Sequence, residues 1–458
     1  MISIQAIKKI YFIGIGGIGM SGLARYFLAR GAHVSGYDKT PTPLTRELEQ
    51  AGIAVHYTDD PDLVPPDADV VCYTPAIPPD QRELQYCLQQ HFTVLKRSDL
   101  LEEVTRHAFT IAIAGTHGKT TTTTLLAHIL KSSGYDCTAF LGGISANYNT
   151  NFLSGNNNTI VVEADEFDRS FWKLHPDLAV ITSVDPDHLD IYGDAATFEE
   201  GFEGFARKLK PGGRLLLKQH LPLAGKLSDL APSTYALQDP TADFYAADIF
   251  PERDLLHFRF HTPISTSGPA VLGIPGQHNL ENAVAAAAVA WMLGVELEAI
   301  GTALESFRGV KRRFEYILRS ERHIYIDDYA HHPKEIRAFL QSLRFIYPDK
   351  KITCIFQPHL YSRTRDFAAD FAASLSLADA LILLPIYPAR ELPIPGVDSE
   401  MILEMTDAPE RCVVKKEEVL DLLEKTKPEL LVTVGAGDID TLVEPIRVLL
   451  TKLSKANA

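Results

Sequence analysis

The segment AIAGTHGKTTTTTLLAHILKSSG, residues 112–134, restricts the fold of this chain more than any other stretch. Its apolar start predicts a buried strand, its glycines predict a turn, and the remainder predicts an amphipathic helix that ends at about Ser132. In such a layout the turn's backbone N–H groups and the helix N-terminus face phosphate groups. Lys119 would bring a positive charge to the terminal phosphates, and Thr120 could bind Mg²⁺. The segment therefore predicts a phosphate-binding loop on a parallel α/β sheet.

This loop is shorter than the common G-x-x-x-x-G-K-[ST] pattern. Ile113 stands where that pattern requires glycine, and the first glycine of the loop is Gly115. The alternative is a threonine-rich helix start that contains Gly-Lys by chance. Because a run of five threonines is a poor helix start, we favour the phosphate loop.

Short apolar runs alternate with helical stretches along the rest of the chain, which is typical of parallel α/β sheets. The 458 residues are enough for several domains. We predict an N-terminal Rossmann-like domain at 1–97, a central P-loop ATPase-like domain with a parallel or mixed sheet at 98–309, and a C-terminal Rossmann-like domain at 310–458.

A second glycine-rich loop, FIGIGGIGMSG, follows the first predicted strand. Gly14, Gly16 and Gly19 match G-x-G-x-x-G, and the next strand ends at Asp38, where a ribose-binding acid would stand. By itself this pattern predicts an NAD-dependent oxidoreductase. A separate phosphate loop would be superfluous for such an enzyme, so we expect this loop to hold a different diphosphate.

Two predicted strands of the central segment, in TIVVEADEFD and LAVITSVDPDHLDIYGD, end in acidic residues. In open α/β sheets, ligands bind beyond the carboxyl ends of the strands, where the phosphate loop also lies. Oxygen and imidazole ligands there could hold Mg²⁺ together with Thr120. Glu163 and His188 are the preferred candidates because each closely follows an apolar strand. The other acids are Asp165, Glu166, Asp185, Asp187 and Asp190.

The third segment carries polar clusters after two successive strands, in IDDYAHHPKEI and FQPHLYSRTRD. Together these clusters indicate a small-molecule site. Two further motifs, GVKRRFE and GQHNLEN, carry basic and amide side chains. Asn279 and Asn282 could read a purine edge or cap a helix.

Composition excludes several classes of function. The chain has 44 Lys and Arg against 59 Asp and Glu and no basic block, so we expect no nucleic-acid partner. Its five cysteines are scattered without a C-x-x-C pair, which predicts neither a disulfide framework nor a zinc knuckle. With no 18-residue apolar run, we expect no membrane insertion and a cytoplasmic location. The oligomeric state stays open.

The motifs GTHGKTTT, EADEFDRSF, DPDHLDIY, GQHNLENAVAA, GVKRRFE, DDYAHHPKEI and QPHLYSRTRD occur in this order along the chain. In this respect the chain resembles the Mur ligase family of peptidoglycan synthesis. The loop GIGGIGMSGLA and the histidine of GTHGKT are most similar to the alanine-adding members. The resemblance implies that an acyl phosphate forms from ATP and UDP-N-acetylmuramate, with Mg²⁺, and that L-alanine then attacks it. A murein-recycling ligase and, more distantly, an NAD-dependent oxidoreductase are the alternatives.

The resemblance also implies residue roles. The ATP site would comprise Gly115, Thr116, His117, Gly118, Lys119, Thr120, Thr121, Asn279, Asn282, Arg312 and Arg313. The Mg²⁺ ligands would be Thr120, Glu163 and His188. The UDP-sugar site would comprise Gly14, Gly16, Gly17, Ile18, Gly19, Met20, Ser21, Asp38, Thr74, Ala76 and Ile77. Alanine would be bound by Tyr329, His331, His359 and Arg363. The catalytic residues would be Lys119, His188, His331 and His359.

Two details qualify the comparison. Many family members have arginine after the histidine of QPH, where this chain has Leu360, so the contact to the alanine carboxylate would fall to Arg363, with Arg365 as the second candidate. Several sister ligases use a carbamylated lysine beyond the second acidic motif. No lysine occurs between Asp185 and Arg207, as expected for the alanine-adding type.

Overall fold

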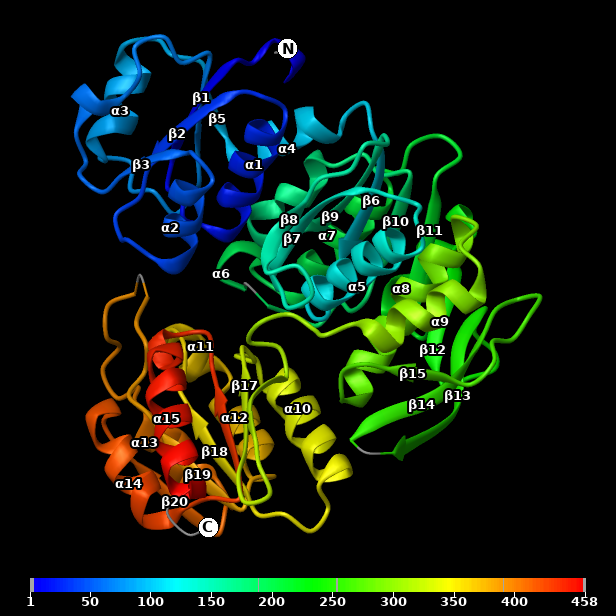
Figure 1. Ribbon diagram of the computed structural model, residues 1–458, viewed down its shortest axis with the longest axis vertical. Helices are drawn as coiled ribbons and strands as arrows, with labels where there is room; N and C mark the ends of the chain where they lie inside the picture. The colour runs from blue at the N-terminus through cyan, green and yellow to red at the C-terminus, as the bar shows by residue number, and fades with distance from the viewer. Residues whose placement is uncertain (1–3, 188, 253, 390, 456–458) are drawn as a thin grey trace. The chain divides into compact units, whose positions relative to one another are not determined.

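The computed structural model describes residues 4–187, 189–252, 254–389 and 391–455, and it contains three β-sheets (Figure 1). By compactness the chain divides into two units. The first comprises Met1–Asp248, Phe258–Ala270 and Glu281–Phe307, and the second comprises Ile249–His257, Val271–Leu280 and Arg308–Ala458. The domain bounds expected from the sequence stay a prediction.

The N-terminal sheet has the strand order β3-β2-β1-β4-β5, and all of its pairs are parallel. Its strands are β1 (Lys9–Ile13), β2 (His33–Tyr37), β3 (Ala54–His56), β4 (Val70–Tyr73) and β5 (Val94–Lys96). Its helices are α1 (Ile18–Ala29), α2 (Pro43–Gln50), α3 (Arg82–Gln89) and α4 (Arg97–Thr105), with short 3-10 turns η1 (Ile4–Ala6) and η2 (Pro61–Leu63). Strand order reverses at β1, so the loops after β1 and β4 meet at a switch point where ligands commonly bind.

The central sheet has ten strands in the order β15-β14-β13-β12-β11-β10-β6-β9-β7-β8. Its middle strands are parallel, whereas β7 and β8 form an antiparallel hairpin. The strands are β6 (Phe109–Ala114), β7 (Thr138–Ser145), β8 (Thr150–Leu153), β9 (Thr159–Ala164), β10 (Leu178–Ile181), β11 (Arg214–Lys218), β12 (Ser233–Leu237), β13 (Phe244–Glu252), β14 (Leu255–His261) and β15 (Ala270–Leu272). The helices are α5 (Lys119–Ser132), η3 (Phe167–Lys173), α6 (Leu189–Tyr192), α7 (Ala195–Ala206), η4 (Pro222–Ala224), η5 (Ser228–Leu230), α8 (Gln277–Met292) and α9 (Leu297–Ser306).

The C-terminal sheet has the order β16-β17-β21-β18-β19-β20, and only the β16–β17 pair is antiparallel. Its strands are β16 (Glu315–Arg319), β17 (Ile324–Asp328), β18 (Ile352–Phe356), β19 (Ala380–Leu383), β20 (Glu410–Val413) and β21 (Leu430–Val434). The helices are α10 (Pro333–Ile346), α11 (Tyr361–Asp366), α12 (Ala368–Leu375), α13 (Ser399–Met405), η6 (Lys416–Glu418), α14 (Val419–Thr426), η7 (Asp438–Leu442) and α15 (Val443–Lys455). Alternate residues of the central strands enter cores on opposite faces, as a sheet covered on both sides requires.

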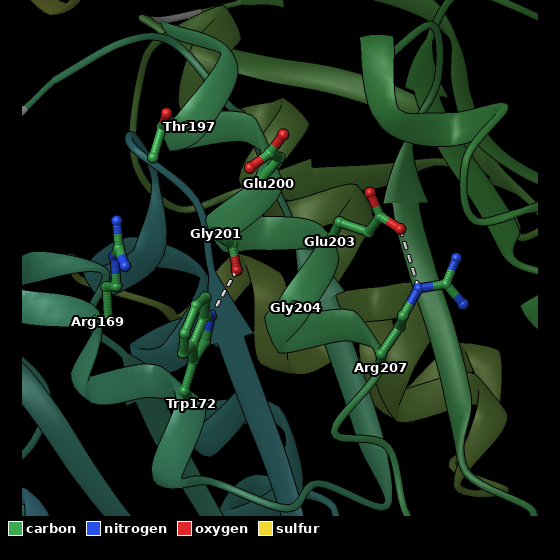
Figure 2. Close-up of a pocket in the computed structure, with 8 residues that line it drawn as sticks. All are labelled: Arg169, Trp172, Thr197, Glu200, Gly201, Glu203, Gly204 and Arg207. Atoms are coloured by element: carbon green, nitrogen blue, oxygen red, sulfur yellow. Dashed lines mark hydrogen bonds and ion pairs between the residues drawn. The ribbon is translucent and has the colours of Figure 1, made fainter. Parts of the chain in front are cut away.

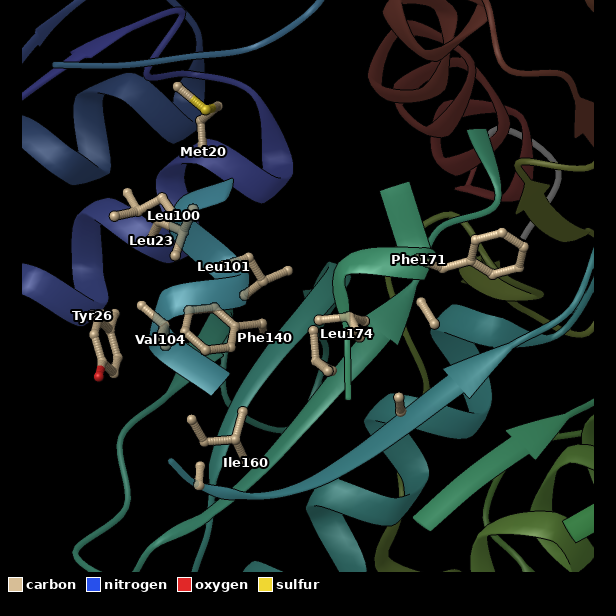
Figure 3. Packing of buried hydrophobic residues seen from close by; sticks show 14 of the residues in the cluster. Met20, Leu23, Tyr26, Leu100, Leu101, Val104, Phe140, Ile160, Phe171 and Leu174 are labelled. Carbon is tan, nitrogen blue, oxygen red and sulfur yellow. The ribbon is translucent and has the colours of Figure 1, made fainter. Parts of the chain in front are cut away.

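A single apolar core joins the N-terminal sheet's helices to the central sheet within the first unit (Figure 3). Tyr26 of α1 lies against Phe140 of β7 with ring centroids 5.5 Å apart, and Phe140 contacts Phe152 of β8 at the same distance. Leu100 of α4 belongs to the same core. Helix α1 begins at the glycine loop, so this packing fixes that loop relative to the central sheet.

Among the helices that the structure describes, none is long and apolar enough to cross a membrane.

Candidate functional site

The predicted phosphate loop lies between β6 and α5, and α5 ends at Ser132 as expected from the sequence. Two glycines give the loop its shape, because Gly115 and Gly118 have φ of +139° and +82°. A methyl group on Gly118 would lie 2.4 Å from Oδ1 of Asn282, so the loop turns closely against α8. This contact places Asn282 beside the loop, and its role at the nucleotide stays a prediction.

Neighbouring strand ends hold the rest of the loop. The hydroxyl of Thr116 donates to the Asp185 carbonyl at 2.7 Å, and the His117 amide donates to Ser183 Oγ at 2.8 Å. The Thr182 hydroxyl donates to the His117 carbonyl at 2.5 Å. Such a preformed loop can bind an anion without having to reorganise.

Lys119 forms a buried ion pair with Glu166. Its Nζ donates to both carboxylate oxygens, at 2.9 and 2.7 Å, and to the Gly115 carbonyl at 2.6 Å. Burial lowers the pKa of Lys119, but the negative charges of Glu166 and Asp165 outweigh it and raise that pKa overall. The lysine is therefore charged and already oriented at the loop.

Glu163 lies beside Thr120 at the end of β9. The Thr120 hydroxyl donates to Oε2 of Glu163 at 3.3 Å, and the Gly142 amide donates to Oε1 at 2.8 Å. Burial raises the pKa of Glu163, whereas the charge of Lys119 opposes that rise. Two of the three predicted Mg²⁺ ligands are thus brought together.

The third predicted ligand, His188, lies outside the described residues. Within the ranges that the structure describes, no group of three or more His, Cys, Asp or Glu side chains forms a ready metal site.

The glycine loop between β1 and α1 lies next to Asp38 and the turn after β4. The Gly16 amide donates to Oδ2 of Asp38 at 2.7 Å. A methyl group on Gly14 would lie 3.1 Å from side-chain carbons of both Thr74 and Ile77. The structure therefore brings three predicted parts of the UDP-sugar site together: the glycine loop, Asp38 and the turn after β4.

The remaining predicted residues of that site, Gly17, Ile18, Gly19, Met20, Ser21 and Ala76, belong to the same loop, to the first turns of α1 or to the β4 turn. One further residue fixes the start of this helix. Asn151 of β8 is fully buried, and its amide donates to the Ile18 carbonyl at 2.6 Å and to Ser21 Oγ at 2.8 Å.

The predicted amino-acid residues form a cluster in the second unit. The rings of His331 and Tyr329 have centroids 5.4 Å apart, and those of His331 and His359 are 6.3 Å apart. Nη1 of Arg363 lies 3.5 Å from Nδ1 of His359. Burial lowers the pKa of His331 to about 4, although Glu335 opposes the shift, so this imidazole is neutral at pH 7.

Arg312, Arg313 and Asn279 also belong to the second unit. Both guanidinium groups lie over the Tyr329 ring, at 5.1 and 5.2 Å from its centroid. Arg312 also donates to Asp327 at 3.1 Å and to the Gly435 carbonyl at 2.7 Å. The Asn279 amide donates to the Pro275 carbonyl at 2.7 Å, a contact that holds the start of α8.

Several side chains at these sites were not among the predicted site residues. Glu163, the preferred acid of the motif, contacts Thr120, whereas Glu166, which follows the end of β9, pairs with Lys119. The sequence did offer a signal for Glu166, since it belongs to the same acidic run. It gave no comparable signal for Asn151 or Thr182.

A pocket of about 350 Å³ lies elsewhere on the first unit, between η3 and α7 (Figure 2). The Trp172 indole donates to the Gly201 carbonyl at 2.8 Å, and a methyl group on Gly204 would lie 3.0 Å from that indole. Arg169 and Arg207 stand at its sides (Figure 2). None of the predicted site residues lines this pocket.

Models of known families match three successive parts of the chain. These are the Mur ligase family catalytic domain at residues 9–109, the Mur ligase middle domain at 113–290, and the Mur ligase glutamate ligase domain at 312–437.

Whole relatives match as well. The UDP-N-acetylmuramate–L-alanine ligase of Porphyromonas gingivalis is 50% identical over 454 residues, covering 97% of this chain and 100% of the relative. The ligase of the same name from Parabacteroides distasonis is 49% identical, with 98% of each chain covered. The crystal structure of UDP-N-acetylmuramate-alanine ligase from Thermotoga maritima has a TM-score of 0.82 at 29% identity, covering 98% of this chain and 100% of that one. A murein peptide ligase from Psychrobacter arcticus shares the fold, with a TM-score of 0.71 at 24% identity and 97% and 98% coverage.

A glycine-rich loop after β1, a Gly-Lys-Thr loop after β6 and an acidic segment at the end of β9 together are typical of a nucleotide-binding α/β protein. With these matches, the chain belongs to the Mur ligase family. The expected family and the three-domain α/β fold class are confirmed.

Proposed function

We propose that this chain is an ATP-dependent ligase that joins L-alanine to the carboxylate of UDP-N-acetylmuramate. One observation carries the proposal: the P-loop, the glycine loop and the cluster around His331 are three distinct groups of predicted binding residues. The P-loop and the glycine loop belong to the first unit, and the cluster around His331 belongs to the second. The matched ligases of the same length bear the name of this reaction.

In the first step, the γ-phosphoryl group of ATP passes to the muramyl carboxylate and ADP leaves. The resulting acyl phosphate has phosphate as its leaving group, whereas a free carboxylate would have to expel oxide. Lys119 and the loop amides offset the negative charge that would otherwise repel the attacking carboxylate. Within this scheme we assign Gly115, Thr116, His117, Gly118, Thr120, Thr121, Asn279, Asn282, Arg312 and Arg313 to the ATP site.

The residues present fit a magnesium ion. Thr120 and Glu163 bring oxygen atoms to within 3.3 Å of each other beside the loop, and Mg²⁺ prefers oxygen ligands. The burial that raises the pKa of Glu163 also favours a cation as its neighbour. When bound, the ion would neutralise phosphate charge, and His188 remains a proposed further ligand.

In the second step, the alanine amine attacks the acyl carbon and phosphate leaves. The amine must be neutral, so a base has to accept its proton. Burial lowers the pKa of His331 to about 4, which leaves this imidazole uncharged at pH 7 but makes it a weak base, and His359 beside it is the other candidate. Arg363 is the cation that we assign to the alanine carboxylate, and Tyr329 completes this site.

The glycine loop would hold the diphosphate of UDP-N-acetylmuramate through backbone N–H groups at the start of α1. Asp38 and the turn carrying Thr74, Ala76 and Ile77 would surround the rest of the nucleotide sugar. The loop would thus bind a substrate and carry no redox cofactor.

Phosphate release from ATP tests the proposal when UDP-N-acetylmuramate and L-alanine are each omitted in turn. Release that requires both supports it. Release with L-alanyl-γ-D-glutamyl-meso-diaminopimelate but not with L-alanine would instead identify a recycling ligase. A change in NADH absorbance without ATP would identify an oxidoreductase.

A further inference from the structure

The three acids of the segment EADE face three different partners. Glu163 accepts from Thr120, and Glu166 accepts from Lys119, so both serve the P-loop. Asp165 lies between them, and its Oδ2 is 3.7 Å from Nη2 of Arg97. One short segment therefore contacts the P-loop and also a cation on the first residue of α4.

Arg97 lies against the glycine loop. A methyl group on Gly19 would lie 3.1 Å from both Cδ and Nη1 of this arginine. Gly19 belongs to the first turn of α1, whose N-terminus would face a bound diphosphate. The guanidinium is thus close to the place where two phosphate charges would arrive.

The ion pair between Arg97 and Asp165 is loose. Its distance of 3.7 Å is too long for a hydrogen bond, and the two side chains are 24% and 44% exposed. The Phe167 amide donates to Oδ1 of Asp165 at 3.2 Å, which fixes this carboxylate in its own turn. Exposed pairs of this kind contribute little stability, whereas arginine binds phosphate through short charge-assisted hydrogen bonds.

We propose that Asp165 and the diphosphate of the nucleotide sugar compete for Arg97. Without ligand, Asp165 keeps the guanidinium beside the glycine loop; when the diphosphate binds, the guanidinium passes to it. This proposal deepens the proposed function and rests on it, because it requires the glycine loop to bind a diphosphate. Asp165 is then a positioning residue, and Arg97 a binding residue.

The exchange also reaches the P-loop. The negative charge of Asp165 contributes to raising the pKa of Lys119, and it adds to the effect of burial in raising the pKa of Glu166. When Arg97 leaves Asp165, that carboxylate loses a counter-ion close to Lys119. Occupation of the glycine loop thus changes the electrostatic potential at the P-loop.

Calorimetric binding of UDP-N-acetylmuramate, without ATP or divalent cations, tests the competition in a double-mutant cycle. We expect Arg97→Met to raise Kd by about 10-fold or more, because a charge-assisted contact is lost. Asp165→Asn should lower Kd by about threefold, because the competitor is removed. In the Arg97→Met background, Asp165→Asn should have no effect.

Asp99→Asn is the matched control. Asp99 lies on α4, as Arg97 does, and forms an ion pair with Lys173 of η3. Asp99→Asn therefore removes one negative charge, as Asp165→Asn does, and weakens another ion pair between α4 and the segment that follows β9. We expect its Kd to stay within about twofold of the wild type. Circular dichroism and the unfolding midpoint of each variant report whether it is folded.

The competition is overturned if Asp165→Asn leaves Kd unchanged or raises it, or if its gain persists in the Arg97→Met background. The latter result would indicate a general charge effect. Failure to bind UDP-N-acetylmuramate would overturn both the competition and the assignment of the loop. A wild type that binds this ligand but makes no product with ATP and L-alanine would refute the proposed function alone.

Discussion

At the scale of single residues, Lys119 gives the most direct test of the P-loop. We expect Lys119→Ala to lower phosphate release by about 100-fold or more, because it removes the charge that the proposed scheme places at the transferred phosphoryl group. Binding of UDP-N-acetylmuramate should remain measurable and weaken only about threefold, since the P-loop affects the glycine loop only through the charge of Asp165. Turnover close to that of the wild type would contradict the scheme.

That variant also leaves Glu166 buried without its cation, which destabilises the fold. The double variant Lys119→Met with Glu166→Gln removes both charges and is the suitable control. It should unfold at a temperature closer to that of the wild type than Lys119→Ala does, while remaining inactive. Recovery of activity in the double variant would show that Lys119 is not required for catalysis.

A buried carboxyl in the N-terminal sheet leads to a pH-dependent stability. Tyr11 donates to Glu83 at 2.6 Å and contacts His56 at 2.7 Å, so β1, α3 and β3 meet at this point. Burial raises the pKa of Glu83 from 4.5 to about 7. The folded state therefore favours the protonated form. The stabilisation that the folded state gains from protonated Glu83 is fully present below pH 4.5 and is lost as the pH rises through about 7.

Chemical denaturation at pH 5 and pH 8 checks this expectation. The wild type should lose about 1–3 kcal/mol more stability over this interval than Glu83→Gln, whose side chain does not titrate. Equal losses in the two proteins would mean that Glu83 does not carry the effect.

At the scale of elements, two glycines at opposite ends of α5 form a matched pair. Gly118 at its start and Gly134 after its end both have positive φ, at +82° and +77°. A methyl group on Gly118 would lie 2.4 Å from Asn282, whereas one on Gly134 would meet nothing within 4 Å. Alanine at either position would therefore strain the backbone, whereas only alanine at Gly118 would also cause a steric clash.

We expect Gly118→Ala to weaken binding of a non-hydrolysable ATP analogue by about 10-fold or more, because the loop must move away from α8. Gly134→Ala should cost about 1 kcal/mol of stability and leave binding unchanged. Fluorescence titration with the analogue distinguishes the two. Equal weakening in both variants would assign the effect to backbone strain.

These elements also show how far the sequence could predict the structure. The strand and helix around the P-loop follow from local apolar periodicity and glycines, and α5 ends at Ser132 as predicted. The hairpin β7–β8 was not predicted, because its pairing depends on contacts with β9 and α1 that are distant in sequence. Likewise, a motif could nominate Glu163, but only the folded turn shows that Glu166 faces Lys119.

At the scale of the whole molecule, the division of the chain into two units predicts that the two steps of the reaction can be impaired separately. The residues assigned to the alanine carboxylate belong to the second unit, whereas Lys119 and the glycine loop belong to the first. Formation of the acyl phosphate needs no alanine. Damage to the alanine site should therefore block the second step and spare the first.

Arg363→Met tests this separation. Without the guanidinium, which lies 3.5 Å from His359, we expect KM for L-alanine to rise by about 10- to 100-fold, because a charge-assisted contact to its carboxylate is lost. With ATP and UDP-N-acetylmuramate alone, hydroxylamine should trap the acyl phosphate as a hydroxamate at close to the wild-type rate. Because Arg363 is buried, circular dichroism and the unfolding midpoint serve as the control for folding of the second unit, and binding of the ATP analogue serves as the control for the P-loop. If the variant binds the analogue normally but yields no hydroxamate, the second unit is needed before alanine arrives. A substitution in the alanine site could then not block the second step without also blocking the first.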